Sequence, residues 1–131
     1  MEFTIKRKKW LRGQLDSALL HISTSKMCCL GIYAKACGYK PKEIRGVPTL
    51  ADLSNVKSGV EKFTDENGAN NYLASNLMSV NDHEICCDKD NSVILERKNG
   101  TPYIVTVDSE EKREALIKKL FDKAKIQVTF E

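Results

Sequence analysis

The chain has 131 residues, of which 41% are hydrophobic and 30% charged, a composition typical of globular proteins that predicts one domain over residues 1–131. It has no apolar run near the roughly 18 residues of a membrane-spanning helix and no signal-peptide core behind its charged N-terminus, so we expect a cytoplasmic protein without a membrane partner. The net charge of +3 is uneven, because residues 1–50 carry ten Lys or Arg against three Asp or Glu, which indicates one positive face.

In the first third, residues 3–5 alternate between apolar and polar side chains and predict a short strand. Ser25 is the expected N-cap of a helix over residues 26–37, with Gly38 at the position that ends it. Apolar residues occupy most sides of this helix, which predicts a central, buried position. Gly31 inside it indicates a close approach by neighbouring backbone.

The middle of the chain is predicted to be less regular. Residues 15–22 favour irregular or briefly extended structure, and residues 41–46 favour a helical turn or loop. Glycines and a proline interrupt residues 46–68, which we expect to form a long, partly ordered connection. A helix over residues 69–80 should follow, because its apolar residues recur at helical spacing.

Two alternating segments, residues 92–97 and 101–107, flank Asn99-Gly100. An Asn-Gly pair between two such segments is the strongest short signal for a β-hairpin.

A final helix is expected to begin at Asp108 as its N-cap, with Glu111 completing a capping box. Residues 126–130 alternate and predict a last strand, which we expect to pair with residues 3–5. The predicted fold class is therefore α+β, in which a small mixed or antiparallel sheet with adjacent terminal strands and an Asn-Gly hairpin packs with about three helices.

The cysteines fall as two adjacent pairs and one single residue: Cys28, Cys29, Cys37, Cys86 and Cys87. Adjacent cysteines rarely bond each other, and an odd number argues against a disulfide framework. Neither pair has the Cys-x₂-Cys spacing of zinc sites, so we expect free thiols and no metal or other cofactor.

Several short segments spread over the chain form a recognisable pattern. They are Phe3-Thr4-Ile5, Lys9-Trp10-Leu11-Arg12-Gly13, Leu19-Leu20, Lys26-Met27-Cys28-Cys29-Leu30-Gly31, Ala36-Cys37-Gly38, Leu77-Met78, Asn81-Asp82 and Ile126-Gln127-Val128-Thr129-Phe130. In these segments the chain resembles a family of small, largely uncharacterised bacteriophage and prophage proteins. The resemblance implies a phage accessory protein, and such proteins often act against host defence. Relative to shorter members, the hairpin around Asn99-Gly100 resembles an insertion.

The basic run around the only tryptophan is the main candidate for a binding site. Arg7, Lys9 and Arg12 could hold phosphate groups while Trp10 stacks on a base. The alternative is a solvated strand end with Trp10 anchored in the core. DNA or RNA binding is disfavoured, because no helix-turn-helix or aromatic platform accompanies the charge.

Asn70 and Tyr72 form a second candidate, since amides and a tyrosine suit recognition of a ribose or a base edge. The same residues also suit the start of a helix. The only two imidazoles, His21 and His83, are not tied by spacing to any cysteine nucleophile, so catalysis is not expected.

Three functions follow as expectations. The first is a non-catalytic protein of the host-cell cytoplasm that sequesters a phosphorylated, nucleotide-derived immune signal, such as a cyclic nucleotide or an ADP-ribose-like molecule. The second is a protein–protein inhibitor of a host defence effector, and the third is a hydrolase acting on nucleotides. Homo-oligomerisation is left open.

Overall fold

The computed structural model describes residues 1–87 and 89–131, and its helices and strands form a small α+β fold. The strands are β1 (Glu2–Ile5), β2 (Ser92–Glu96), β3 (Pro102–Thr106) and β4 (Gln127–Phe130). The helices are α1 (Cys29–Ala36), α2 (Pro41–Ile44), α3 (Tyr72–Asp82) and α4 (Glu110–Asp122). Short 3-10 helices occur at Arg7–Lys9, Leu50–Asp52 and Val60–Phe63.

The predicted pairing of the terminal strands is confirmed. β1 and β4 lie side by side in parallel, with Glu2 opposite Gln127 and Ile5 opposite Phe130. The strands fall into two separate two-stranded sheets, one formed by this parallel pair and one by the antiparallel hairpin β2–β3.

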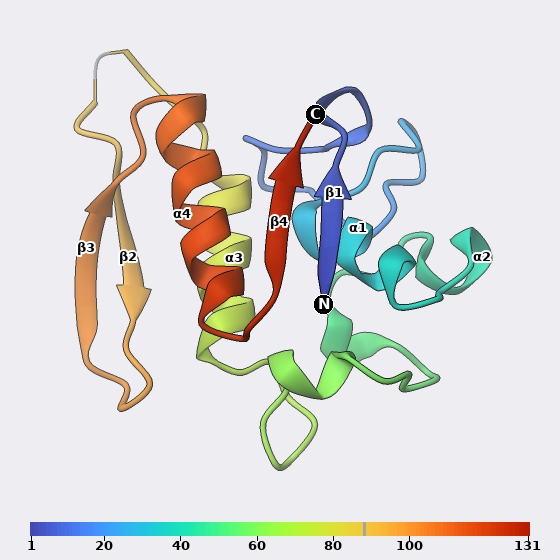
Figure 1. The fold of residues 1–131 in the computed structure, drawn as a ribbon. Helices are drawn as coiled ribbons and strands as arrows, with labels where there is room; N and C mark the ends of the chain where they lie inside the picture. The colour runs from blue at the N-terminus through green and yellow to red at the C-terminus, as the bar shows by residue number, and fades with distance from the viewer. Residues whose placement is uncertain (88) are drawn as a thin grey trace.

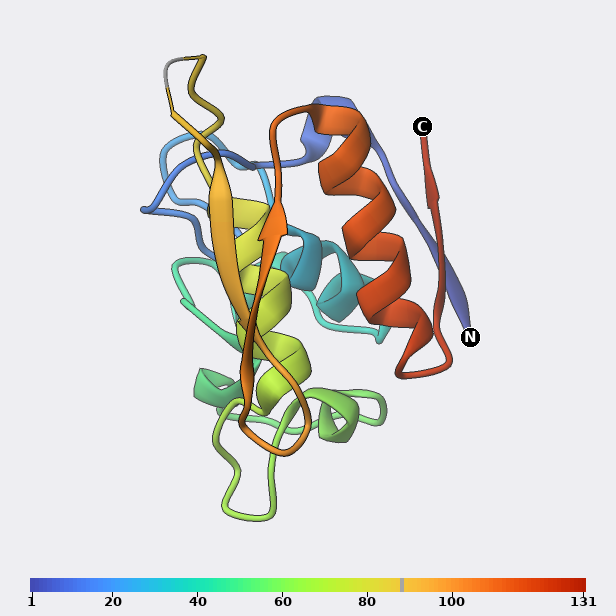
Figure 2. The same cartoon turned by 90° about the vertical axis from the view of Figure 1, so that its left-hand side faces the viewer.

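The two sheets lie on opposite sides of the α3–α4 pair (Figures 1 and 2). Strand β2 packs against α3, and β4 packs against α4. Helix α1 contacts both β1 and α3 and therefore closes the core on the side of the parallel pair. Strand β1 therefore has β4 along one edge, and α1 lies near its other edge.

The hairpin follows the sequence prediction. Residues Glu96 and Pro102 form its last pair before the turn. Gly100 has φ +88°, a conformation that glycine adopts at little cost, and the side chain of Asn99 accepts a hydrogen bond from the backbone N–H of Thr101 at 2.9 Å.

Helix α1 starts three residues later than predicted. Ser25 has φ +58° and is not its N-cap, because the next residues are held extended by the basic run. Met27 donates its N–H to the carbonyl of Lys9 at 3.0 Å and accepts from the N–H of Leu11 at 2.8 Å. Because of these long-range hydrogen bonds, the helix begins only at Cys29.

The central position of α1 and the close approach at Gly31 are confirmed. Leu30 and Ala34 are fully buried. A Cβ atom built on Gly31 would lie 1.7 Å from the carbonyl oxygen of Leu19. Only glycine fits at this contact between helix and backbone.

The starts of the two later helices also differ from the prediction. Helix α3 begins at Tyr72 rather than residue 69, with Asn71 as its N-cap. The N-cap of α4 is Ser109 and not Asp108, because Ser109 accepts from the N–H of Lys112 at 3.1 Å. Asp108 instead forms an ion pair with the side chain of Lys112 at 3.0 Å.

Four aromatic rings form the centre of the core. Phe3, Tyr33, Phe63 and Phe121 pack mostly edge to face, with ring centroids 5.0–5.6 Å apart. The hydroxyl of Tyr33 donates to the carbonyl of Gly59 at 2.8 Å, which ties the long connection over residues 46–68 to α1.

Candidate anion-binding site

Trp10 is a core residue in the structure. Its side chain is 2% exposed, and its indole N–H donates to the side-chain oxygen of Asn81 at 2.7 Å. The ring of Phe130 packs beside the indole of Trp10, with the two centroids 5.1 Å apart. The guanidinium of Arg12 lies over the indole, 4.3 Å from its centroid. The ring is therefore enclosed by the protein's own side chains.

Arg7 and Arg12 form ion pairs with glutamates of α4. The guanidinium of Arg7 donates two hydrogen bonds to the carboxylate of Glu114, both at 2.7 Å. Arg12 donates to Glu110 at 3.0 Å. The hydrogen bond from Arg7 lowers the pKa of Glu114 below its usual value, so this carboxylate is a charged partner at neutral pH.

Asn70 and Tyr72 lie far from Trp10. They precede and begin α3, whereas Asn81, the residue that contacts Trp10, lies near the other end of this helix. The nine residues from Tyr72 to Asn81 correspond to about 14 Å of helix. The structure therefore does not bring the two predicted parts of the site together.

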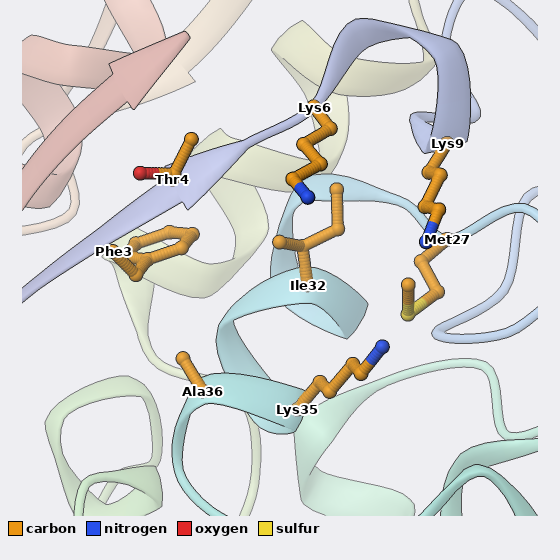
Figure 3. Close-up of a pocket in the computed structure, with 8 residues that line it drawn as sticks. All are labelled: Phe3, Thr4, Lys6, Lys9, Met27, Ile32, Lys35 and Ala36. Carbon is orange, nitrogen blue, oxygen red and sulfur yellow. The ribbon is translucent and has the colours of Figure 1, made fainter. Parts of the chain in front are cut away.

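Lys9 instead faces a hollow of about 230 Å³ together with Lys6 and Lys35. Lys6 follows β1, Lys9 ends the first 3-10 helix, and Lys35 belongs to the last turn of α1. In Figure 3 these three side chains point toward one opening beside Ile32 and Met27. The remaining lining residues are Phe3, Thr4 and Ala36.

A second hollow, of about 380 Å³, shares Lys9, Met27 and Lys35 with the first. We call the two hollows together the lysine groove. The second hollow adds three cations, which are Lys8, Lys26 and Arg45. Its remaining lining residues are Leu20, Thr24, Ser25, Pro41 and Ile44.

The six cations of the lysine groove differ from the paired arginines of the basic run. Among the residues that the structure describes, none of the six forms an ion pair with a carboxylate. Within residues 1–87 and 89–131, no Asp or Glu lines either hollow. Gathering like charges raises the energy of the free protein, and a bound anion would lower it again.

Asn81 connects the basic run, the start of α1 and the end of α3. Its side-chain oxygen accepts from the indole of Trp10 and, at 3.1 Å, from the backbone N–H of Cys29. Its side-chain nitrogen donates to the carbonyl of Leu11 at 3.1 Å, and its own carbonyl accepts from the N–H of Gly13 at 2.8 Å. One buried residue thereby holds the basic run against the start of α1, and so positions both walls that carry the lysines.

Arg113 of α4 supports the same junction. Its side chain is 1% exposed, and its guanidinium donates to the carbonyls of Val80, Asn81 and His83 at 2.6–2.9 Å. These carbonyls lie at the C-terminal end of α3, where the helix itself provides no donors. Arg113, on a neighbouring helix, therefore provides the hydrogen-bond donors that the last carbonyls of α3 lack.

Asn81 belongs to one of the segments quoted for the resemblance, but neither Asn81 nor Arg113 was predicted to hold the site together, although a signal was present. Asn81 continues the apolar stripe of Leu73 and Leu77 at helical spacing, and Arg113 begins the stripe that includes Ile117. A polar residue on an apolar stripe indicates a buried polar group that needs partners.

Among the described residues, no hydrogen bond joins a cysteine thiol to an imidazole. All five cysteines are free, and burial raises the pKa of Cys28 to about 12. His21 lies 3.5 Å from the carboxylate of Asp16, and His83 lies 3.1 Å from the side-chain oxygen of Asn91. Within residues 1–87 and 89–131, no three His, Cys, Asp or Glu side chains gather in a way that could hold a metal ion.

None of the described helices combines the length and the apolar character that crossing a membrane requires. No family model matches the chain, and neither a curated protein nor a solved structure matches it.

Proposed function

We propose that the chain captures a phosphorylated, nucleotide-derived small molecule in the lysine groove and releases it chemically unaltered. The observation that carries this proposal is the convergence of Lys6, Lys9 and Lys35 on one opening without an acidic partner among the described residues (Figure 3). Ammonium groups donate charge-assisted hydrogen bonds to phosphate oxygens.

The apolar lining favours a nucleotide over inorganic phosphate. Ile32 and Met27, each 8% exposed, and the exposed Ala36 lie among the three lysines and offer a small apolar surface that the edge of a base can contact. A bare phosphate would satisfy the cations and leave this surface exposed. A nucleotide satisfies both parts of the groove.

The biological setting follows from the resemblance to phage accessory proteins. A protein that binds a nucleotide signal without hydrolysing it lowers the free concentration of that signal. In the cytoplasm of an infected host, such binding would silence a defence system that the signal activates.

Thermal shift and calorimetry with AMP, ADP-ribose and cyclic di-AMP test the proposal. A ligand present at about 100 times its Kd stabilises the folded state by about 2.7 kcal/mol. For a domain of this size, that corresponds to a rise in Tm of about 10 °C. Recovery of the ligand after heat denaturation, followed by mass spectrometry, separates capture from turnover.

Lysine replacements show where the ligand binds. Each charge-assisted bond is worth about 1.5 kcal/mol at an exposed site, so the double variant Lys9→Gln/Lys35→Gln should weaken binding roughly a hundredfold. The control is Lys98→Gln/Lys123→Gln, which removes the same charge outside the groove. Equal affinity of the two double variants would refute the lysine groove as the site.

The predicted role of the arginines is tested in the same assay. Arg7→Gln should leave the affinity within about threefold of the wild type, because its guanidinium is held by Glu114. A loss as large as that of the lysine variants would assign the ligand to the basic run instead.

The hairpin favours a protein–protein inhibitor as the second candidate. Ile94 and Ile104 are direct cross-strand partners, and both are about two-thirds exposed (67% and 68%). A pair of exposed β-branched residues on one face of a hairpin suits contact with another protein. Replacement of both by Thr should abolish protection of a phage from host defence under this reading, and should leave it intact if capture in the groove is the function.

A further inference from the structure

We infer that the ligand of the lysine groove consists of two nucleoside units joined through phosphate, with one unit in each hollow. This inference rests on the proposed function and specifies the class of molecule that the groove selects. It is carried by the way in which the two hollows are joined and by what each hollow offers.

The shared wall of the groove lies where phosphates would be needed. Lys9, Met27 and Lys35 line both hollows, so two of the six cations stand between them. Lys6 adds a third cation from the side of the first hollow. A ligand with its negative charge at the centre and a ring system at each end matches this order.

The first hollow offers a surface for a base and groups that can bind its edge. Phe3, Ile32 and Ala36 supply apolar area. Thr4 also lines this hollow, and it belongs to β1, which among the described strands has a partner on one side only.

The backbone of Thr4 points away from that partner. Met1 and Ile5 accept hydrogen bonds from the last strand and its flanking residue, and Arg7 donates one to Glu131. Alternate residues of a strand direct their backbone groups to opposite edges, so the N–H and C=O of Thr4 lie at the free edge of β1. One donor beside one acceptor is the pattern that the edge of a nucleobase can pair with.

The second hollow offers apolar surface under a denser set of charges. Leu20, Pro41 and Ile44 line it together with Lys8, Lys26 and Arg45. Pro41 is exposed, whereas Leu20 and Ile44 are buried beneath the surface of the hollow. A second nucleoside unit fits this composition because its ring can pack on Pro41 while a phosphate meets the cations.

A single nucleotide would use the groove incompletely. It would fill one hollow, of which the first (about 230 Å³) lies below the usual range for ligand sites and the second (about 380 Å³) at its low end. The cations of the other hollow would then have no anion. Linking two units lets the second bind at a high effective concentration, so the dinucleotide should bind roughly tenfold or more tightly than the mononucleotide.

Matched pairs of ligands test this directly. Calorimetry compares AMP with the dinucleotide pApA, GMP with pGpG, and the hexanucleotide of the better base. We expect the better dinucleotide to bind roughly tenfold or more tightly than its mononucleotide. At equal strand concentrations the hexanucleotide should gain no more than about fivefold over the dinucleotide, which is the statistical factor of its overlapping dinucleotide registers.

Filling one hollow should remove the advantage of the second unit. Thr24 is exposed and lines only the second hollow, so Thr24→Trp should bring the dinucleotide within about threefold of the mononucleotide. Ser23→Trp is the control, since Ser23 is exposed and lines neither hollow. Circular dichroism and Tm confirm that both variants are folded.

The outcomes separate this inference from the proposed function. Equal affinity for mononucleotide and dinucleotide, with both lost in Lys9→Gln/Lys35→Gln, would overturn the two-unit ligand and keep the phosphate site. Affinity that rises with each nucleotide up to the hexanucleotide would overturn it in favour of a nucleic-acid strand. Absence of binding by every probe would refute the proposed function and this inference together.

Discussion

Replacement of Gly31 by alanine isolates the tightest contact of the fold. The new Cβ would lie 1.7 Å from the carbonyl oxygen of Leu19 and 2.5 Å from its carbonyl carbon. Ordinary contact begins near 3.4 Å, so α1 and the backbone at Leu19 must separate by about 1.7 Å.

The segment at Leu19 cannot retreat freely. Its N–H donates to the carbonyl of Val47 at 2.9 Å, and the carbonyl of Leu20 accepts from the N–H of Gly46 at 2.8 Å. On the other side, the carbonyl of Ala18 accepts from the N–H of Cys28 at 3.2 Å. A shift of this size therefore breaks hydrogen bonds as well as packing.

The opposing effects can be weighed. Alanine gains about 1 kcal/mol of helix propensity over glycine. Overpacking costs about 1–3 kcal/mol, and two lost hydrogen bonds cost about 1 kcal/mol each. We expect Gly31→Ala to lower the free energy of unfolding by about 2–4 kcal/mol, and to lower Tm by about 8–15 °C.

Urea unfolding and differential scanning calorimetry measure both quantities. Gly68→Ala is the control, because Gly68 has φ +79° but no atom within 4 Å of its built Cβ, so it carries conformational strain alone, about 1–2 kcal/mol. If Gly31→Ala were as stable as the wild type, or more stable, the close approach would be refuted.

Three further predictions concern buried polar groups and thiols. Asn81→Ala should lower the free energy of unfolding by about 3–5 kcal/mol, since it leaves two N–H groups and one carbonyl without partners; a loss below about 1 kcal/mol in urea would contradict its role. Burial raises the pKa of Asp82 above 3.8, because the buried side chain favours its protonated form. The stabilisation that the protonated form gives the folded state is complete below that pH and is lost as pH rises through the folded-state pKa. Asp82→Asn should therefore gain stability relative to the wild type between about pH 3 and pH 7, and a constant difference would disprove the raised pKa. Without denaturant, a thiol reagent should modify the exposed Cys87 rapidly and the buried Cys28 and Cys29 slowly, with all five thiols reacting after unfolding; rapid reaction of all five in the native protein would argue against the burial.

Much of the fold was predictable because local signals agreed with the tertiary structure. The Asn99-Gly100 turn indicates its hairpin from the turn residues and the strands beside them. The alternation at residues 126–130 likewise indicates a strand from local sequence alone. The start of α1 was not predictable in this way. Its position depends on the bonds of Met27 to Lys9 and Leu11, which join segments far apart in the chain.

The candidate site was likewise predictable where it depends on local sequence, and not where it depends on distant residues. The excess of Lys and Arg in the first fifty residues predicts a positive face, and six of those residues line the lysine groove. Which cations are neutralised depends on Glu110 and Glu114, about a hundred residues later. Nothing in the local sequence of Arg7 or Arg12 indicates these partners, whereas Lys9 was a predicted site residue and lies in the groove.

The parallel pairing of β1 with β4 has a consequence for when the groove forms. β1 supplies Phe3 and Thr4 to the first hollow, and it pairs with β4, which spans Gln127–Phe130. Contacts of such high sequence separation form late in folding, because a long loop must close before they stabilise anything. During synthesis the groove therefore lacks an ordered wall until residues 127–130 are available, so a chain that stops short of them should keep its lysines and lose its ligand site.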